Sequence, residues 1–238
     1  MKLMKEITDQ YNKDLSNADP AQAIVYFQTL FPGQCIFSTS LGAEDQVLTE
    51  ILAKTVPAIR IFTLDTGRLF QETYDLIHIT EQKYKIKIGV VFPDHASVEK
   101  MVNFKGINLF YDSVENRREC CHIRKIEPLQ RMLKGMKVWI TGLRKEQSLA
   151  RAGVEMVNWD ETHSIIKLNP LISWTEEDVW SSIRSNKIPY NSLHDKGFPS
   201  IGCLPCTRAI LPGEDIRAGR WWWEGGSMKE CGLHDHEK

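Results

Sequence analysis

The chain has 238 residues and a hydrophobic content of 42%, which is enough to bury a full core and excludes disorder throughout. Its 30 Lys and Arg residues nearly balance its 31 Asp and Glu residues, so no global charge marks a nucleic-acid-binding or membrane-binding protein. An anionic ligand would therefore have to be held by a local pocket.

The N-terminal residues lack the apolar segment of a secretory signal, and no apolar run approaches the roughly 18 residues of a membrane-spanning helix. We therefore expect a cytoplasmic protein. Thiols stay reduced in that compartment, so the six cysteines, most of them grouped, favour metal binding or catalysis over disulfides.

Short apolar runs typical of strands alternate with helical apolar spacing through the first two thirds of the chain. A helix over residues 21–30 follows Asp19-Pro20 and ends before Pro32-Gly33. Strands are predicted at 35–40, 59–64, 86–92 and 137–141, and helices at 45–54, 69–84, 98–104 and 123–133. This alternation predicts an α/β, Rossmann-like fold, in which helices flank a parallel sheet.

The last quarter of the chain changes character. A capped helix starts at residues 173–178 and runs to about 186. Beyond Pro189 the periodicity fades into a segment rich in Gly, Pro, Trp and charge. We predict one main domain over residues 1–212 and a flexible, functional C-terminal tail over 213–238.

The loop after the first predicted strand, Phe37-Ser38-Thr39-Ser40-Leu41-Gly42, presents hydroxyls, a glycine and backbone N–H groups. Ligands of open parallel sheets bind beyond the carboxyl ends of the strands, so Ser38, Ser40 and Gly42 are candidate anion-binding residues. The loop lacks the Gly-Lys-Ser/Thr of a P-loop, which excludes a standard ATP site. The alternative is an ordinary strand-to-helix turn with a serine cap.

A second loop, Leu64-Asp65-Thr66-Gly67-Arg68, ends the second predicted strand in the same way. Asp65 is a candidate acceptor for a ribose or an adenine, and helix capping by Asp65 or Thr66 is the simpler alternative. Together the two loops resemble the modified PP-loop and the LDTG segment of the adenine-nucleotide hydrolase-like superfamily, which implies the fold of that superfamily.

Two cysteine pairs lie far apart in the sequence. Cys203 and Cys206 have the C-x-x-C spacing that lets two thiolates reach one metal or cluster, and Cys120 and Cys121 are adjacent. Spacing alone leaves a zinc site, a dithiol redox pair and buried structural cysteines open. Adjacent cysteines are unusual for zinc, whereas a larger cluster accommodates their diverging side chains better. Cys35 lies in an apolar strand and is expected in the core.

The residues around both pairs resemble motifs of one enzyme family. Cys120-Cys121-His122-Ile123-Arg124-Lys125-Ile126-Glu127-Pro128-Leu129 is similar to the CCxxRKxxPL motif of the assimilatory adenylyl-sulfate (APS) reductases. Ile201-Gly202-Cys203-Leu204-Pro205-Cys206-Thr207-Arg208 is similar to their IGCxPCTR motif. The resemblance implies that Cys120, Cys121, Cys203 and Cys206 bind a 4Fe-4S cluster, which supports the site without transferring electrons.

The resemblance extends to basic residues. Arg144 lies in a stretch similar to the family's GLRxxQS…R motif, and Arg217 and Arg220 match family positions that contact the sulfate or phosphate. Lys125 is the candidate link between the cluster and the substrate charge. The planar fork of an arginine suits a phosphosulfate because it makes paired hydrogen bonds to tetrahedral anions. A solvated basic face is the alternative for each residue taken singly.

The tail contains Lys229-Glu230-Cys231-Gly232-Leu233-His234, which resembles the family's KxECGLH motif with its nucleophilic cysteine. The resemblance implies that the Cys231 thiolate attacks the sulfuryl sulfur of adenosine 5′-phosphosulfate, releases AMP and keeps an S-sulfonate. Reduced thioredoxin, or glutaredoxin, would then release sulfite for assimilatory sulfate reduction and cysteine biosynthesis. Taken alone, Cys231 would be an incidental exposed thiol.

Other interpretations stay open. The closest is a reductase of 3′-phosphoadenosine 5′-phosphosulfate (PAPS), or of both substrates. The four paired cysteines favour the unphosphorylated one, and Glu44 and Asp45 would repel an additional phosphate if they face it. A PP-loop ATP pyrophosphatase would need an SGGxDS-type loop and a basic surface, and a metal-stabilised binding module leaves the KECGLH tail unexplained.

We expect a homo-oligomer, as is frequent in the family, with no nucleic-acid or membrane partner. No motif assigns a role to Arg117 or Arg118.

Overall fold

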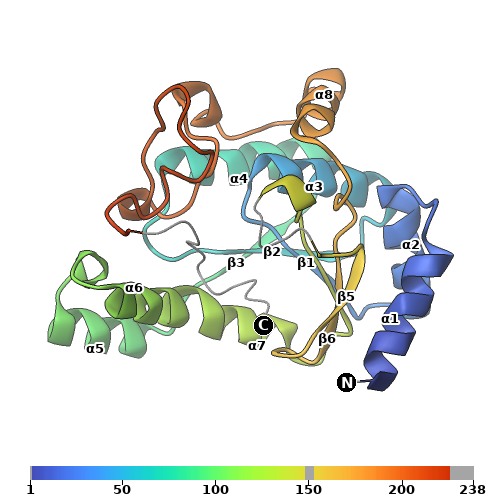
Figure 1. Cartoon of the computed structure of the whole chain (residues 1–238), viewed down its shortest axis with the longest axis horizontal. Coiled ribbons are helices and arrows are strands. Elements are labelled where there is room, and N and C mark those ends of the chain that lie inside the picture. The colour runs from blue at the N-terminus through green and yellow to red at the C-terminus, as the bar shows by residue number, and fades with distance from the viewer. Residues whose placement is uncertain (1, 148–152, 226–238) are drawn as a thin grey trace. The chain divides into compact units, whose positions relative to one another are not determined.

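The computed structural model describes residues 2–147 and 153–225 (Figure 1). The chain divides into two compact units. The first unit comprises residues 1–63, 75–89 and 133–191, and the second comprises residues 64–74, 90–132 and 192–238. Ser148, Arg151 and Cys231 lie outside the described residues. The predictions for the end of the GLRxxQS…R stretch and for the KxECGLH motif therefore stay predictions. The predicted domain boundary between residues 212 and 213 also stays a prediction.

The first unit is built on a six-stranded sheet with the order β3-β2-β1-β4-β6-β5. Its strands are β1 (Cys35–Ser38), β2 (Arg60–Leu64), β3 (Ile88–Val91), β4 (Val138–Ile140), β5 (Val157–Asp160) and β6 (Ile165–Leu168). Strand β1 pairs in parallel with β2 and β4, and β4 pairs in parallel with β6, whereas β5 is antiparallel to β6. The strand order reverses between β1 and β4, which is where open α/β sheets bind ligands.

Helices α1 (Lys2–Asp14), α2 (Pro20–Leu30), α3 (Ala43–Thr55), α8 (Glu176–Asn186) and most of α4 (Gln71–Tyr84) belong to the first unit. The sequence sets two of their starts, because Asp19 with Gln22, and Thr175 with Asp178, form capping boxes. Phe27, Phe37, Leu48, Leu168 and Ile183 share one core contributed by helices and strands. This core fixes the helices on the sheet.

The second unit contains α5 (His95–Lys105), α6 (Val114–Cys121) and nearly all of α7 (Glu127–Leu133). A π-helical turn, His122–Ile126, joins α6 to α7, so that the two helices run on as one rod (Figure 1). From residue 192 onward the described chain forms short 3₁₀ turns, at His194–Lys196 and Leu204–Cys206, and an isolated antiparallel bridge between Thr207 and Arg220. Met101, Phe110 and Trp221 pack with Cys120 and Cys206 in a small separate core.

The structure confirms the predicted α/β fold and the four predicted strands, each to within a few residues. Helices α1 and α6 and the antiparallel pair β5–β6 were not predicted. The predicted helix 123–133 is wrong in its first turn, which is π-helical. None of the helices in the described part of the chain is long and apolar enough to cross a bilayer.

Candidate functional site

The first candidate region is the loop between β1 and α3, at the reversal of strand order. Gly42 is the N-cap of α3, and no side chain among the described residues caps it, so the serine-cap alternative is wrong. Leu41 buries its side chain while its backbone adopts φ +61°, a left-handed conformation that is uncommon outside glycine. The loop therefore leads into an uncapped helix N-terminus, a site suited to an anion.

Asp45, in the first turn of α3, organises this loop. Its Oδ2 accepts hydrogen bonds from the Ser40 amide at 2.6 Å and the Ser40 hydroxyl at 2.7 Å, and the Gly142 amide also donates to this carboxylate. Burial raises the pKa of Asp45 to about 6, although the bonds from Ser40 and Gly142 oppose the shift. A Cβ at position 142 would lie 2.2 Å from Asp45 Oδ1, so this close approach requires glycine. Asp45 thus links the loops that follow β1 and β4.

Ser38, the last residue of β1, is held from the neighbouring strand. Its Oγ accepts a hydrogen bond of 2.7 Å from the indole N–H of Trp139 in β4. The Trp139 ring is in turn contacted by the buried Lys167, whose Nζ lies 4.8 Å from the ring centroid. With this lone pair engaged, the Ser38 hydroxyl can still donate its proton to a ligand.

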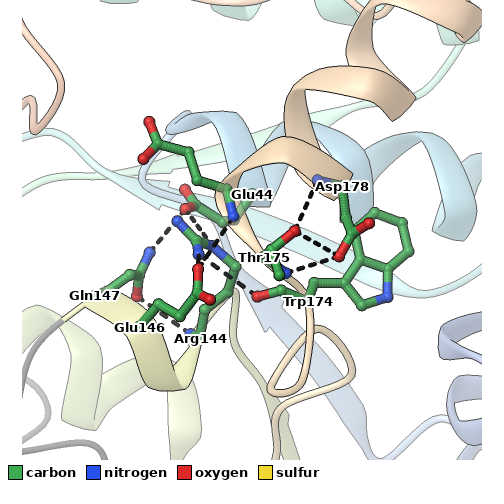
Figure 2. A network of polar contacts seen from close by, with 8 residues as sticks. Glu44, Arg144, Glu146, Gln147, Trp174, Thr175 and Asp178 are labelled. Carbon is green, nitrogen blue, oxygen red and sulfur yellow. Dashed lines mark hydrogen bonds and ion pairs between the residues drawn. The ribbon is translucent and has the colours of Figure 1, made fainter.

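Arg144, predicted to bind substrate, lies buried in a polar network (Figure 2). Its Nε donates to Glu44 Oε1 at 2.8 Å, and one terminal nitrogen lies 3.3 Å from Glu146 Oε2. Gln147 donates to the same Glu44 oxygen at 2.9 Å. Arg144 therefore fixes the start of α3 to the loop after β4. Glu44 is paired with Arg144 and Asp45 bonds to backbone amides, so neither carboxylate faces a ligand as a free charge. The expectation that Glu44 and Asp45 repel a 3′-phosphate is therefore not supported.

Asp65, the other predicted nucleotide contact, lies in the second unit. Its Oδ1 accepts hydrogen bonds from the Gly67 amide at 2.7 Å and from the Tyr74 hydroxyl at 2.9 Å. The turn closed by the Gly67 bond requires φ +70° at Gly67, which favours glycine. Helix α4 starts only at Gln71, so the helix-capping alternative is wrong for Asp65. The carboxylate shapes this loop.

The four paired cysteines converge in the second unit. Cys120, Cys121, Cys203 and Cys206 line one pocket together with Arg68, Phe110, Arg117, Arg124, Lys125 and Pro205. Within the described residues, no three Cys, His, Asp or Glu side chains reach the geometry of a closed metal site. The structure thus brings two pairs that are more than 80 residues apart to one place.

The pocket combines four thiols with four basic side chains. Burial and the neighbouring thiols raise the pKa of Cys206 to about 12, while Lys125 opposes the shift. Burial likewise raises the pKa of Cys120, against the lowering effect of Arg124. Each additional thiolate would repel the others, so all four can ionise together only beside a strong positive charge such as a metal centre. The donor set fits such a centre.

The LDTGR loop lies against the C-x-x-C segment. The Thr66 hydroxyl is 3.2 Å from Cys203 Sγ, and the Leu204 amide donates to the Arg68 carbonyl at 2.8 Å. Arg124, on the π-helical turn, donates to the Thr66 carbonyl at 2.6 Å. Single π turns inside helices are frequent at functional sites, and this one follows Cys121 directly and carries Lys125 as well.

The predicted tail arginines lie in the same unit as the cysteines. Arg220 is buried, donates to Ser200 Oγ at 3.2 Å, and lies over the Trp221 ring at 4.7 Å. Arg217 is half-buried and its amide donates to Asp215 Oδ1 at 2.8 Å. Arg220 thus has a packing role beside any contact with substrate.

Sequence reasoning missed three of the basic residues that line the pocket. Arg68 and Arg124 belong to motifs that were recognised, LDTGR and CCxxRK, so the signal was present. Arg117 precedes the cysteines by one helical turn, and no motif marks it. Cys35 was predicted correctly as a core residue: it is buried, and burial raises the pKa of its thiol to about 11.

The phosphoadenosine phosphosulfate reductase domain family matches residues 34–209 of the chain. The adenosine 5′-phosphosulfate reductase of Allochromatium vinosum is 53% identical over 202 residues, which is 85% of this chain and 79% of that protein. The enzyme of the same name from Burkholderia cepacia is 52% identical over 199 residues, covering 83% and 79%.

Solved structures agree on the fold. Phosphoadenylyl-sulfate reductase from Candida auris, in a phosphate complex, matches 84% of this chain and 95% of its own with a TM-score of 0.73 and 30% identity. Yeast FAD synthetase in complex with FAD matches with a TM-score of 0.55 and 14% identity, and supports the fold alone.

Proposed function

The chain belongs to the phosphoadenosine phosphosulfate reductase domain family, and from this premise we propose that it reduces adenosine 5′-phosphosulfate to sulfite and AMP. The observation that carries the proposal is the pocket in which four cysteines meet four basic side chains. The unphosphorylated substrate is favoured because the relatives that are more than half identical are named for it. We place the activity in the cytoplasm, in assimilatory sulfate reduction and cysteine biosynthesis.

The pocket suits a 4Fe-4S cluster held by Cys120, Cys121, Cys203 and Cys206. Four thiolates are the usual ligand set of such clusters, and Arg68, Arg117, Arg124 and Lys125 offset their negative charge. When bound, the cluster would supply structural and electrostatic support to the site. Its binding would also release the thiol protons that the buried pocket otherwise retains.

The nucleotide is proposed to bind at the loop of Ser38, Ser40 and Gly42, where the amides of the first turn of α3 favour an anion. Asp45 and Arg144 hold this loop in shape. The phosphosulfate is proposed to be neutralised by Lys125, Arg217 and Arg220, with Asp65 contacting the ribose or adenine.

Chemistry is assigned to Cys231. Its thiolate attacks the sulfuryl sulfur, the bond between that sulfur and the phosphate oxygen breaks, and AMP leaves with the electron pair. A thiolate of reduced thioredoxin or glutaredoxin then attacks Cys231 Sγ, sulfite leaves with the electron pair of the S–S bond, and a mixed disulfide forms. The second thiol of the reductant resolves that disulfide. Two electrons thus pass from the dithiol to the sulfuryl group.

The alternative substrate is PAPS, because the Candida auris relative with the same fold is a phosphoadenylyl-sulfate reductase. Sulfite release decides between them. Anaerobically purified, iron-replete protein is given either sulfonucleotide with reduced thioredoxin, and kcat/KM is measured for each. We expect adenosine 5′-phosphosulfate to be preferred by at least about tenfold. Preference for PAPS would shift the assignment to the alternative, and no sulfite from either would reject it.

A further inference from the structure

An ion pair ties the end of the described chain to the helix of the adjacent cysteines. Arg117 in α6 donates from Nε to Glu224 Oε1 at 2.8 Å and from a terminal nitrogen to Glu224 Oε2 at 3.0 Å. Both side chains are almost inaccessible, with 4% and 6% of their surface exposed. A two-point pair removed from water in this way fixes both position and orientation, and is costly to break.

Arg117 also contacts the cysteine pocket. It lines that pocket, and its guanidinium hydrogen-bonds the Cys121 sulfur. The same cation therefore interacts with one proposed cluster ligand and with Glu224. Glu224 precedes Cys231 by only seven residues in the sequence.

Trp221 strengthens the connection. The Arg117 guanidinium lies 4.6 Å from its ring centroid and that of Arg220 lies 4.7 Å from it. The Trp221 amide donates to the Cys206 carbonyl at 3.2 Å, so this segment is bonded directly to the C-x-x-C pair and is connected to Cys121 through Arg117. Trp221 is buried and adopts φ +43°, a strained conformation for a bulky residue that persists only where its surroundings enforce it.

We propose that Arg117 and Glu224 are positioning residues for the reaction: their buried pair fixes the point from which the segment carrying Cys231 leaves, next to the four-cysteine pocket. This proposal rests on the assignment of Cys231 as nucleophile. A fixed starting point limits the volume that the thiol explores, and so raises its effective concentration at the bound sulfonucleotide. Arg117 thereby couples cluster binding in the cysteine pocket to the positioning of the Cys231 thiol.

The test separates positioning from folding and from binding. Glu224→Gln keeps the shape of the side chain and removes its charge. With the iron-replete protein we expect iron content, visible absorbance and KM for adenosine 5′-phosphosulfate to stay within about twofold of wild type, while the single-turnover rate of S-sulfonate formation on Cys231 falls about tenfold or more. A rate equal to wild type overturns the proposal.

Glu214→Gln is the control. Glu214 forms a two-point pair with the two terminal nitrogens of Arg208, at 2.8 and 2.9 Å, in the same unit but partly exposed and outside the cysteine pocket. We expect this variant to behave like wild type. If Glu224→Gln fails to retain iron, Glu224→Asp replaces it in the test, because aspartate keeps the negative charge but has a shorter side chain. With iron intact, a reduced rate of S-sulfonate formation in Glu224→Asp supports the proposal. An unchanged rate overturns it.

Protease sensitivity measures the anchoring of this segment without enzyme turnover. Limited trypsinolysis followed by mass mapping reports cleavage after Arg220, which is buried and next to Trp221. We expect Glu224→Gln to accelerate this cleavage about fivefold or more, and Glu214→Gln not to. If wild type forms no adduct on Cys231, the proposed function fails. Equal cleavage of Glu224→Gln and wild type means instead that the pair does not anchor the segment.

Discussion

Asp45 places a carboxylate among backbone amides at the expected nucleotide loop. Its folded-state pKa of about 6 lies above the value of 3.8 for an exposed aspartate. The folded state therefore retains the proton to higher pH than the unfolded chain, and the stability that this proton contributes is lost as pH rises toward and through 6. An ionised, buried Asp45 at neutral pH lowers stability, which is understandable if its hydrogen bonds hold the loop in shape for an anion.

The linkage predicts a specific difference between wild type and Asp45→Asn. On lowering the pH from 7 to 4.5, wild type should gain about 2 kcal/mol of unfolding free energy relative to the variant, because only wild type binds the extra proton. Urea denaturation at the two pH values measures this difference, and other titrating groups cancel between the two proteins. Parallel pH dependences would show that Asp45 does not titrate in this range.

Arg144 is predicted to stabilise the loop that follows β4. Arg144→Ala leaves Glu44 partly buried without its cation and should lower the unfolding free energy by about 2 kcal/mol. Arg184→Ala, which breaks an exposed pair with Glu177 on α8, should cost less than about 0.5 kcal/mol. Chemical denaturation compares the two variants. Equal losses would mean that the Arg144 network is no more than a surface feature.

Lys125 is the basic side chain of the pocket that we expect to act on the substrate. Lys125→Ala should lower kcat/KM by at least about tenfold, equivalent to about 1.4 kcal/mol of lost charge stabilisation. Lys100→Ala, an exposed lysine of α5 in the same unit, is the control and should change little. Steady-state assays of both variants, with iron contents matched, distinguish a substrate contact from a general loss of positive charge.

At the level of elements, the sequence predicted secondary structure best where the spacing of apolar residues is regular. The runs that became β1, β2, β3 and β4 alternate with helices, so the parallel sheet was predictable from pattern alone. Strands β5 and β6 are four residues each; β5 carries Asn158 and Asp160, and the apolar run of β6 is short and interrupted by Lys167, so neither stands out. Helix α6, Val-Glu-Asn-Arg-Arg-Glu-Cys-Cys, has hardly any apolar residues, because its buried side chains are Arg117 and two cysteines.

The cysteine pocket was predictable only in part. The spacing of Cys203 and Cys206 indicates a shared ligand, yet no local rule brings them to Cys120 and Cys121; the resemblance to a known family supplied that step. In the structure the four cysteines line one pocket, which long-range packing alone could bring about. Arg117 was missed because pairing with a glutamate 107 residues away leaves no mark in a local pattern.

Both cysteine pairs should be required for binding of the metal cluster. Anaerobically purified protein is expected to hold about four irons per chain with broad visible absorbance, and Cys203→Ser should lose both. Cys35→Ser is the matched control, since Cys35 lies in the core of the first unit, and it should keep its iron. Iron and acid-labile sulfide analysis measures both. Stoichiometric zinc without labile sulfide would replace the cluster by a zinc site.

At the scale of the whole molecule, each unit is assembled from separated segments of the chain. The first contributes the sheet, the loop after β1 and the Arg144 network, and the second contributes the four cysteines with their basic side chains. A single polar loop or a lone C-x-x-C would fit many proteins. The proposed reaction requires both sets of residues in one protein, together with a nucleophile in the C-terminal segment.

The covalent intermediate tests this account most directly. Incubating wild type with adenosine 5′-phosphosulfate and no thioredoxin should release about one equivalent of AMP per active site and leave a sulfonate on one cysteine, because a nucleophile completes its first step without the reductant. Peptide mapping by mass spectrometry should find that sulfonate on Cys231, and Cys231→Ser should show neither adduct nor turnover. A sulfonate on Cys203 or Cys206, or full sulfite production by Cys231→Ser, would contradict the assignment.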